Sequence, residues 1–108
     1  MDNGFQRVAN LDEVPEGDFL AVTAPNGDSV LLTKVSARVF AFSQLCTHAD
    51  AWLDAGEIHP RTMEIECPLH GGAFSLETGE PTRLPPTDPI AVYPVRIEGE
   101  DVYLGAPA

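Results

Sequence analysis

Two short segments, each with one cysteine and one histidine, constrain this chain more than any other feature. The first is Cys46-Thr47-His48 and the second is Cys67-Pro68-Leu69-His70, and together they contain both cysteines of the 108-residue chain. Thiolate and imidazole groups are common metal ligands in proteins. The sequence therefore predicts two loops that face each other across a shared metal centre.

The order of the ligands within each segment indicates which centre this is. Structural zinc sites usually present two closely spaced cysteines followed by two closely spaced histidines, whereas sulfur and nitrogen alternate here. A [2Fe-2S] centre with two thiolates on one iron and two imidazoles on the other needs one ligand for each iron from each loop. We therefore interpret Cys46, His48, Cys67 and His70 as ligands of one [2Fe-2S] cluster in an electron-transfer protein. A mononuclear zinc site with the same four ligands is the alternative, and it would leave the protein colourless.

Size and charge limit what such a centre could serve. A chain of this length predicts a single domain spanning residues 1–108. Seventeen acidic against six basic residues give a formal charge of −11, which argues against nucleic acid and anionic membranes and favours a basic docking partner. No signal peptide, bilayer-spanning stretch or spare cysteine for a disulfide is visible. We expect a soluble, cytoplasmic protein, with a monomer as the simplest state of a diffusing carrier.

Short apolar runs between ten prolines and nine glycines predict an all-β fold. A hairpin is expected around Asn26-Gly27, where both residues would adopt the positive φ angles of a tight turn. A second hairpin is expected from about 56 to 66, with its tip near His59, and it leads into Cys67. A helical turn is expected at 11–15. The other expected strands are 5–9, 39–42, 73–76, 93–97 and 101–104, with Pro94 indicating a sheet edge or bulge.

The spacing Cys-x-His followed by Cys-x-x-His resembles that of Rieske proteins, and the chain is most similar to the small Rieske ferredoxins of bacterial aromatic-ring-hydroxylating dioxygenase systems. Further matching positions are Gly71, Phe74, Thr78-Gly79-Glu80, Pro85-Pro86 and Tyr93-Pro94-Val95. The resemblance implies an antiparallel β-sandwich with a small cluster-binding subdomain at about 44–86. It also implies that Cys46 and Cys67 hold the inner iron, while His48 and His70 hold the outer one.

The same resemblance implies a function. The chain would carry one electron at a time from a flavin-containing NAD(P)H-dependent ferredoxin reductase to the terminal oxygenase of an aromatic-ring dioxygenase system, without being an enzyme itself. The alternative is a Rieske-like small subunit of another oxidoreductase, such as a nitrite reductase. Respiratory Rieske proteins have a disulfide where this chain has Ala51 and Leu69, and hydroxyl donors where it has Gly72 and Phe74. We therefore expect a reduction potential below zero on the hydrogen scale.

Several residues near the ligand segments have two interpretations each. His59 is expected to be an exposed residue of a hairpin tip, outside the site. Trp52 could pack under the first loop or lie at the cluster and partner surface. The segment Leu84-Pro85-Pro86 could shield the cluster or only connect strands. The acidic residues near the loops could be simple solvated charges or a docking surface for a basic partner; they are Asp50, Asp54, Glu57, Glu64 and Glu66.

Overall fold

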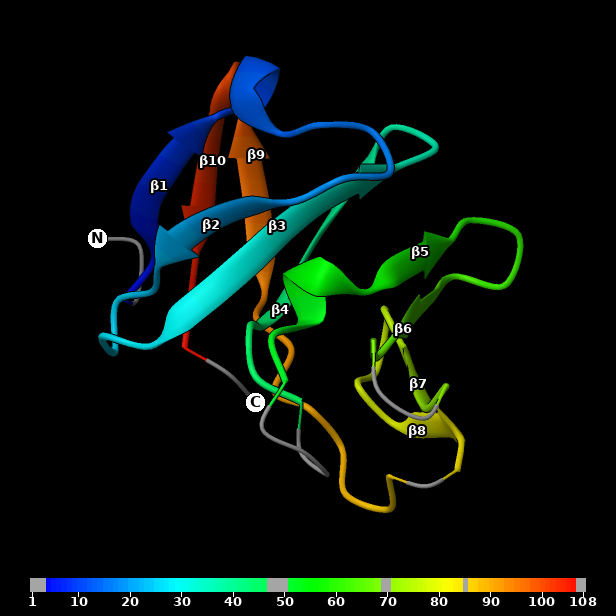
Figure 1. Cartoon of the computed structure of the whole chain (residues 1–108). Coiled ribbons are helices and arrows are strands. Elements are labelled where there is room, and N and C mark those ends of the chain that lie inside the picture. Colours follow the sequence, from blue (N-terminus) through cyan, green and yellow to red (C-terminus); the bar gives the residue numbers. More distant parts are fainter. Residues whose placement is uncertain (1–3, 47–50, 69–70, 85, 107–108) are drawn as a thin grey trace.

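The computed structural model describes residues 4–46, 51–68, 71–84 and 86–106, which form three antiparallel sheets (Figure 1). The first sheet has the order β1 (Gln6–Asn10), β10 (Asp101–Leu104), β9 (Val95–Glu98). The second has the order β2 (Leu20–Thr23), β3 (Ser29–Val35), β4 (Arg38–Ser43). The third has the order β5 (Glu57–His59), β6 (Glu64–Glu66), β7 (Ala73–Ser75), β8 (Pro81–Arg83). Two short 3-10 helices are η1 (Leu11–Glu13) and η2 (Leu53–Ala55).

The second sheet lies between the other two, and its central strand β3 is buried on both faces. Successive side chains of a strand point to opposite faces, so Val30 and Leu32 of β3 join a core with β1 and β10, whereas Leu31 and Val35 join a core with the third sheet. Phe42 of β4 also belongs to the core shared with the third sheet. Its ring packs edge-on against that of Phe19, which directly precedes β2, with ring centroids 6.3 Å apart. Two cores on one shared sheet explain why β3 reads as a nearly continuous apolar run.

The hairpin between β2 and β3 is confirmed, but its turn differs from the one expected. Thr23 pairs with Ser29, Gly27 N–H donates to Ala24 O at 2.9 Å, and Gly27 has a φ of 90°. Asn26 does not have a positive φ. Only one left-handed residue is needed because the loop is longer than a two-residue turn and ends in a bulge at the glycine.

The third sheet contains the predicted second hairpin and one strand that the sequence pattern did not predict. Ile58 of β5 pairs with Ile65 of β6, as the alternation of apolar and acidic residues indicates. β8 was not among the expected strands, yet it pairs with β7 at the edge of this sheet. Its sequence, Pro-Thr-Arg, is mostly exposed and begins with proline, which is compatible only with an edge strand.

The first sheet brings the two ends of the described chain together. Gln6 pairs with Leu104, and the exposed ion pair Arg7 Nε–Asp101 Oδ1 at 2.8 Å spans the same two strands. β9 lies at the edge of the sheet and follows Pro94 directly, as the proline indicated. The predicted helical turn at 11–15 is present as η1.

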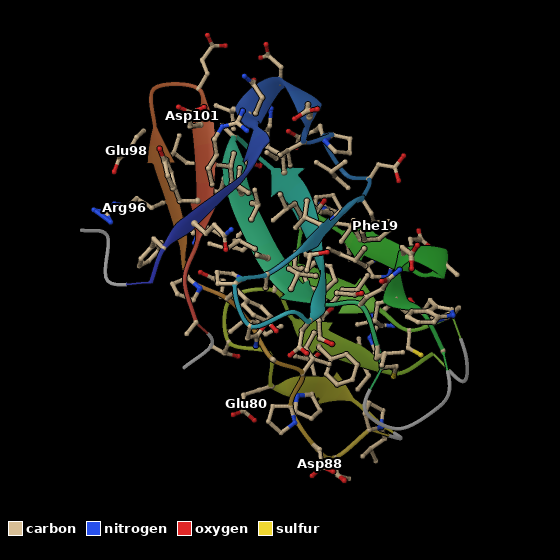
Figure 2. All side chains as sticks on the ribbon, turned by 90° about the vertical axis from the view of Figure 1, so that its left-hand side faces the viewer. Phe19, Glu80, Asp88, Arg96, Glu98 and Asp101 are labelled. Carbon is tan, nitrogen blue, oxygen red and sulfur yellow. The ribbon has the colours of Figure 1, made fainter. Side chains whose placement is uncertain are left out.

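These sheets confirm the predicted all-β, antiparallel architecture. The negative charges are spread over both ends of the molecule, since the labelled Glu98 and Asp101 lie at one end and Glu80 and Asp88 at the other (Figure 2). Among the residues the structure describes, no helix is long and apolar enough to cross a bilayer.

Candidate metal centre

The first ligand loop is closed by hydrogen bonds at its base. Leu45 and Trp52 form an isolated antiparallel bridge, Cys46 N–H donates to Ala51 O at 3.0 Å, and Leu53 N–H donates to the carbonyl of Gln44 at 2.7 Å. Because neighbouring residues point to opposite sides, Cys46 is buried while the bridged Leu45 and Trp52 are exposed. The loop therefore directs its thiol inward and presents two apolar side chains outward.

The second ligand loop is closed in the same way. Cys67 N–H donates to Gly72 O at 2.7 Å, and the flanking residues Glu66 and Ala73 pair as the last register of β6 and β7. Cys67 and Ala73 are both buried. Each cysteine thus begins a loop whose sixth residue accepts its backbone N–H. The two loops differ in their supports, because the second loop lies between two strands of a four-stranded sheet.

Both cysteines belong to the same buried core, which places the two predicted sulfur ligands on one side of the third sheet. Neither forms a disulfide. Two buried thiols in one core fit the sulfur half of a [2Fe-2S] site, because a thiolate needs a metal or a cation to be stable inside a protein. The predicted ligands His48 and His70 lie outside the described residues.

His59 is not the exposed hairpin-tip residue that the sequence indicated. Its Nε2 lies 2.7 Å from Glu66 Oε1, and both side chains are half-buried. Arg83 of β8 approaches Glu66 and also Glu64, with N–O distances of 3.8 and 3.6 Å. The interpretation as simple solvated charges is therefore wrong for Glu64 and Glu66. These four side chains bind the strands of the third sheet together beneath the second ligand loop.

Glu64 is the most strongly held carboxylate of this group. The hydroxyls of Thr82 and Thr62 donate to it, the second at 2.7 Å, and Arg83 lies nearby. These contacts lower the pKa of Glu64 against the opposing effect of burial. Asp54 and Glu57 are exposed, which is compatible with both interpretations of the acidic residues near the loops. Asp50 lies outside the described residues.

Large exposed apolar side chains gather at the bases of both ligand loops. Leu45 and Trp52 are 51% and 54% exposed, so the hypothesis that Trp52 packs under the loop is wrong. Leu84 is 77% exposed and comes directly after Arg83, which pairs with Ala73 at the end of the second loop. We call Leu45, Trp52 and Leu84 the apolar rim. Leu45 was not predicted to be exposed, although its position next to Cys46 was the signal that it points outward.

Comparison of the sequence with protein families and known relatives gives one consistent answer. Residues 4–94 match the Rieske [2Fe-2S] domain. The chain is 44% identical to the ferredoxin component of a naphthalene 1,2-dioxygenase system from Pseudomonas aeruginosa, covering 87% of this chain and 88% of that protein. It is 43% identical to the ferredoxin component of the naphthalene 1,2-dioxygenase/salicylate 5-hydroxylase systems of a Ralstonia species, covering 96% and 97%.

Solved structures agree with this result. The ferredoxin of carbazole 1,9a-dioxygenase from Nocardioides aromaticivorans superposes with a TM-score of 0.88 at 40% identity, over 94% of this chain and 97% of that one. A ferredoxin solved in complex with the oxygenase of carbazole 1,9a-dioxygenase has a TM-score of 0.83 at 29% identity, over 96% and 94%. A putative nitrite reductase small subunit also has a TM-score of 0.83, over 94% and 98%, but at 19% identity it shows the fold alone.

The two closed ligand loops, their buried thiols and the match over most of the sequence point to the same centre. Such a centre supplies a site that takes up and releases one electron at a time. The chain belongs to the Rieske [2Fe-2S] domain family, and its cofactor is one Rieske-type [2Fe-2S] cluster.

Proposed function

We propose that Cys46, His48, Cys67 and His70 are the four cluster ligands, with the two cysteines on the inner iron. The buried position of both thiols in one core supports this assignment for the sulfur side. For the nitrogen side, the support is the spacing of each histidine from its cysteine within a loop. This arrangement leaves the imidazoles toward the outside, where a partner can approach.

We further propose that the chain is a one-electron carrier from a flavin-containing NAD(P)H-dependent reductase to the terminal oxygenase of an aromatic-ring dioxygenase system. The observation that carries this proposal is the match to named ferredoxin components over nearly their full length. NAD(P)H delivers two electrons as a hydride, so two passages of the carrier are needed for each NAD(P)H oxidised. The carrier itself binds no aromatic substrate and catalyses no oxidation.

The apolar rim supports a docking role for the face that bears the loops. Three of the four large exposed hydrophobic side chains among the described residues are Leu45, Trp52 and Leu84, and all three flank a ligand loop. Exposed apolar side chains beside a functional group are typical of a protein interaction surface. A partner docked there would come close to the proposed histidine ligands, which is what electron transfer between two proteins requires.

Reconstitution tests the proposed function directly. The protein is added to the reductase and oxygenase of the Pseudomonas aeruginosa naphthalene 1,2-dioxygenase system from which the native ferredoxin is omitted, and oxidised naphthalene is measured. We expect NAD(P)H-dependent product that requires this chain and is lost with the variant His70→Ala. In a second arm, the chemically reduced protein is mixed with oxidised oxygenase and its reoxidation is followed by absorption. Failure of electron transfer in both arms, repeated with the carbazole and 3-phenylpropionate oxygenases, would contradict the proposal.

The reduction potential is a separate test of the assigned branch. Phe74 is buried and supplies no hydroxyl near the second loop, and buried Ala51 supplies no thiol for a disulfide. With few donors to the sulfurs of the reduced cluster, we expect a potential near the low end of the Rieske range, about −150 mV. Protein-film voltammetry measures it, and a clearly positive value would contradict this expectation.

A further inference from the structure

A hollow of about 330 Å³ lies beside the first ligand loop. Its walls come from two regions that are separate in sequence: the turn between β2 and β3, and the end of β4 together with the two ends of the first loop. The lining residues are Gly27, Asp28, Ser29, Ser43, Leu45 and Trp52. Two members of the apolar rim therefore form one side of a concave site, and an acidic turn forms the other.

The acidic wall is a fixed and accessible carboxylate. Asp28 is exposed, and its Oδ2 accepts hydrogen bonds from Asn26 Nδ2 at 3.1 Å and from the Tyr93 hydroxyl at 3.3 Å. No ion pair joins Asp28 to a basic side chain in the described part of the chain. The carboxylate is thus held in place by neutral donors and keeps its negative charge available to a ligand.

The combination of walls selects one kind of side chain. An arginine or lysine has an apolar stem that can pack on Leu45 and Trp52, and a cationic head that is attracted both to an indole face and to a carboxylate. An apolar side chain would remove water from Asp28 without replacing its hydrogen bonds, and an acidic one would be repelled. The charge of −11 on the whole chain adds attraction for a basic partner.

We propose that this hollow receives an arginine or lysine side chain of the terminal oxygenase and so fixes the orientation of the docked carrier. The proposal rests on the proposed function. The site lies where orientation matters, because the Leu45–Trp52 bridge directly flanks Cys46, whose N–H closes the first ligand loop. The oxygenase is the partner assigned because a ferredoxin of the same fold has been solved in complex with an oxygenase.

Five variants test the proposal in the reconstituted system: Asp28→Asn, Trp52→Ala, Trp52→Phe, Asp12→Asn and Ile97→Ala. Asp28→Asn removes the charge and keeps a hydrogen-bond acceptor, and Trp52→Ala removes the indole. Asp12→Asn, in η1 at the end of the molecule away from the ligand loops (Figure 1), and Ile97→Ala, exposed on β9, are the matched controls. The measurements are the KM and kcat of oxygenase turnover as the carrier concentration is varied, and the rate at which the reductase reduces each carrier.

We expect Asp28→Asn to raise the KM about threefold and to weaken its dependence on salt. Trp52→Ala should raise the KM about tenfold, as for a central interface aromatic, and Trp52→Phe should recover part of the loss. The kcat, the cluster absorption and the rate of reduction by the reductase should stay within error of the unaltered chain. Both control variants should leave the KM unchanged.

Three results would overturn the proposal. The first is an unchanged KM in both Asp28→Asn and Trp52→Ala, the second is an equal rise of the KM in Asp12→Asn, and the third is an equal loss in the rate of reduction by the reductase. The last would assign the hollow to the other partner. Oxygenase turnover with the unaltered chain tests the proposed function separately. If the unaltered chain supports no turnover, both proposals fall, whereas turnover with unchanged KM values in the variants overturns only this one.

Discussion

The two ligand loops have the same closure and different surroundings. In each loop the cysteine N–H is bonded to a carbonyl five residues further along, at 3.0 Å from Cys46 and 2.7 Å from Cys67. The first loop is held by a single bridge whose two side chains are exposed and apolar. The second is held by β6 and β7, with Arg83, His59 and the acidic residues of β6 bonded beneath it.

This difference indicates that the second loop has mainly a structural role and that the first loop presents side chains to solvent. The second loop is supported on the sheet side by buried Ile65 and Phe74 and by ion pairs, so its position is set by the fold. The first loop is flanked by two of the three residues of the apolar rim, Leu45 and Trp52. Residues that point toward the centre and residues that face solvent alternate along the chain. The exposed side chains beside one loop can therefore be substituted to suit a partner without altering the geometry of the centre.

The largest effect, loss of the cluster, should come from replacing the cysteine that begins each loop. Replacing Cys46 or Cys67 with serine would remove one of the two sulfur ligands proposed for the inner iron, so each variant should lose nearly all bound cluster. Iron and acid-labile sulfide per chain, with the rhombic EPR signal of the reduced protein, measure this loss. A variant that kept a full cluster would show that its loop does not supply the predicted ligand. Trp52→Ala, which alters a neighbour of the first cysteine ligand, is the control and should keep both metals.

Substitutions beside the two loops should have different effects on the stability of the protein. Phe74 is fully buried and pairs with Ile65. We expect Phe74→Ala to lower the free energy of unfolding by about 3–5 kcal/mol. Trp52 is half exposed, so we expect Trp52→Ala to lower the free energy of unfolding by no more than about 0.5 kcal/mol. Denaturant unfolding of the cluster-loaded protein measures both values. Comparable losses at the two positions would contradict the division between a structural and a presenting loop.

A smaller effect is expected where β5 begins. A side chain at Gly56 would collide with the backbone carbonyl of Glu66, which directly precedes Cys67 of the second loop. Gly56→Ala should therefore cost about 1–3 kcal/mol and shift the EPR signal of the cluster. Gly99→Ala is the control, because it has a positive φ of 62° but open space around it, and it should leave the EPR signal unchanged. Equal spectra for the two variants would show that this contact does not position the second loop.

The four proposed ligands could be predicted from the sequence because their chemistry is local. One thiol and one imidazole in each of two short segments limit the possible centres before any fold is known. The hollow between Trp52 and Asp28 could not be predicted, since its walls meet only after β2, β3 and the first loop have packed. The same is true of His59, whose partner Glu66 lies across a hairpin.

Most strands could be predicted because alternation or apolar runs mark residues that face a core. β8 could not, since an edge strand beginning with Pro81 buries little and its sequence resembles a turn. The pairing of β1 with β10 also joins the two ends of the chain, and no local pattern specifies a partner at that separation. The turn at Gly27 shows that loop length, and not the Asn-Gly pair alone, determines the turn type.

The smallest expected effect is a difference in how the two sides respond to pH. The pKa of Glu64, beside the second loop, is lowered by the Thr82 and Thr62 hydroxyls and by Arg83. Its stabilisation is complete above the ordinary glutamate pKa and is lost as pH falls through the lowered value. The pKa of Tyr93, beside the hollow, is raised by burial and by the charge of Asp28, so its contribution is complete below the ordinary tyrosine pKa and is lost as pH rises through the raised value.

Unfolding free energies measured across pH should therefore change at opposite ends in two variants. Glu64→Gln should flatten the acid side and leave the alkaline side unchanged, because the amide cannot titrate. Tyr93→Phe should flatten only the alkaline side, for the same reason. If Glu64→Gln kept the full acid dependence, the contacts beneath the second loop would not hold that carboxylate in its ionised form. If both variants changed the same side, the two flanks of the centre would not be electrostatically independent, and the contrast between the loops would be one of exposure alone.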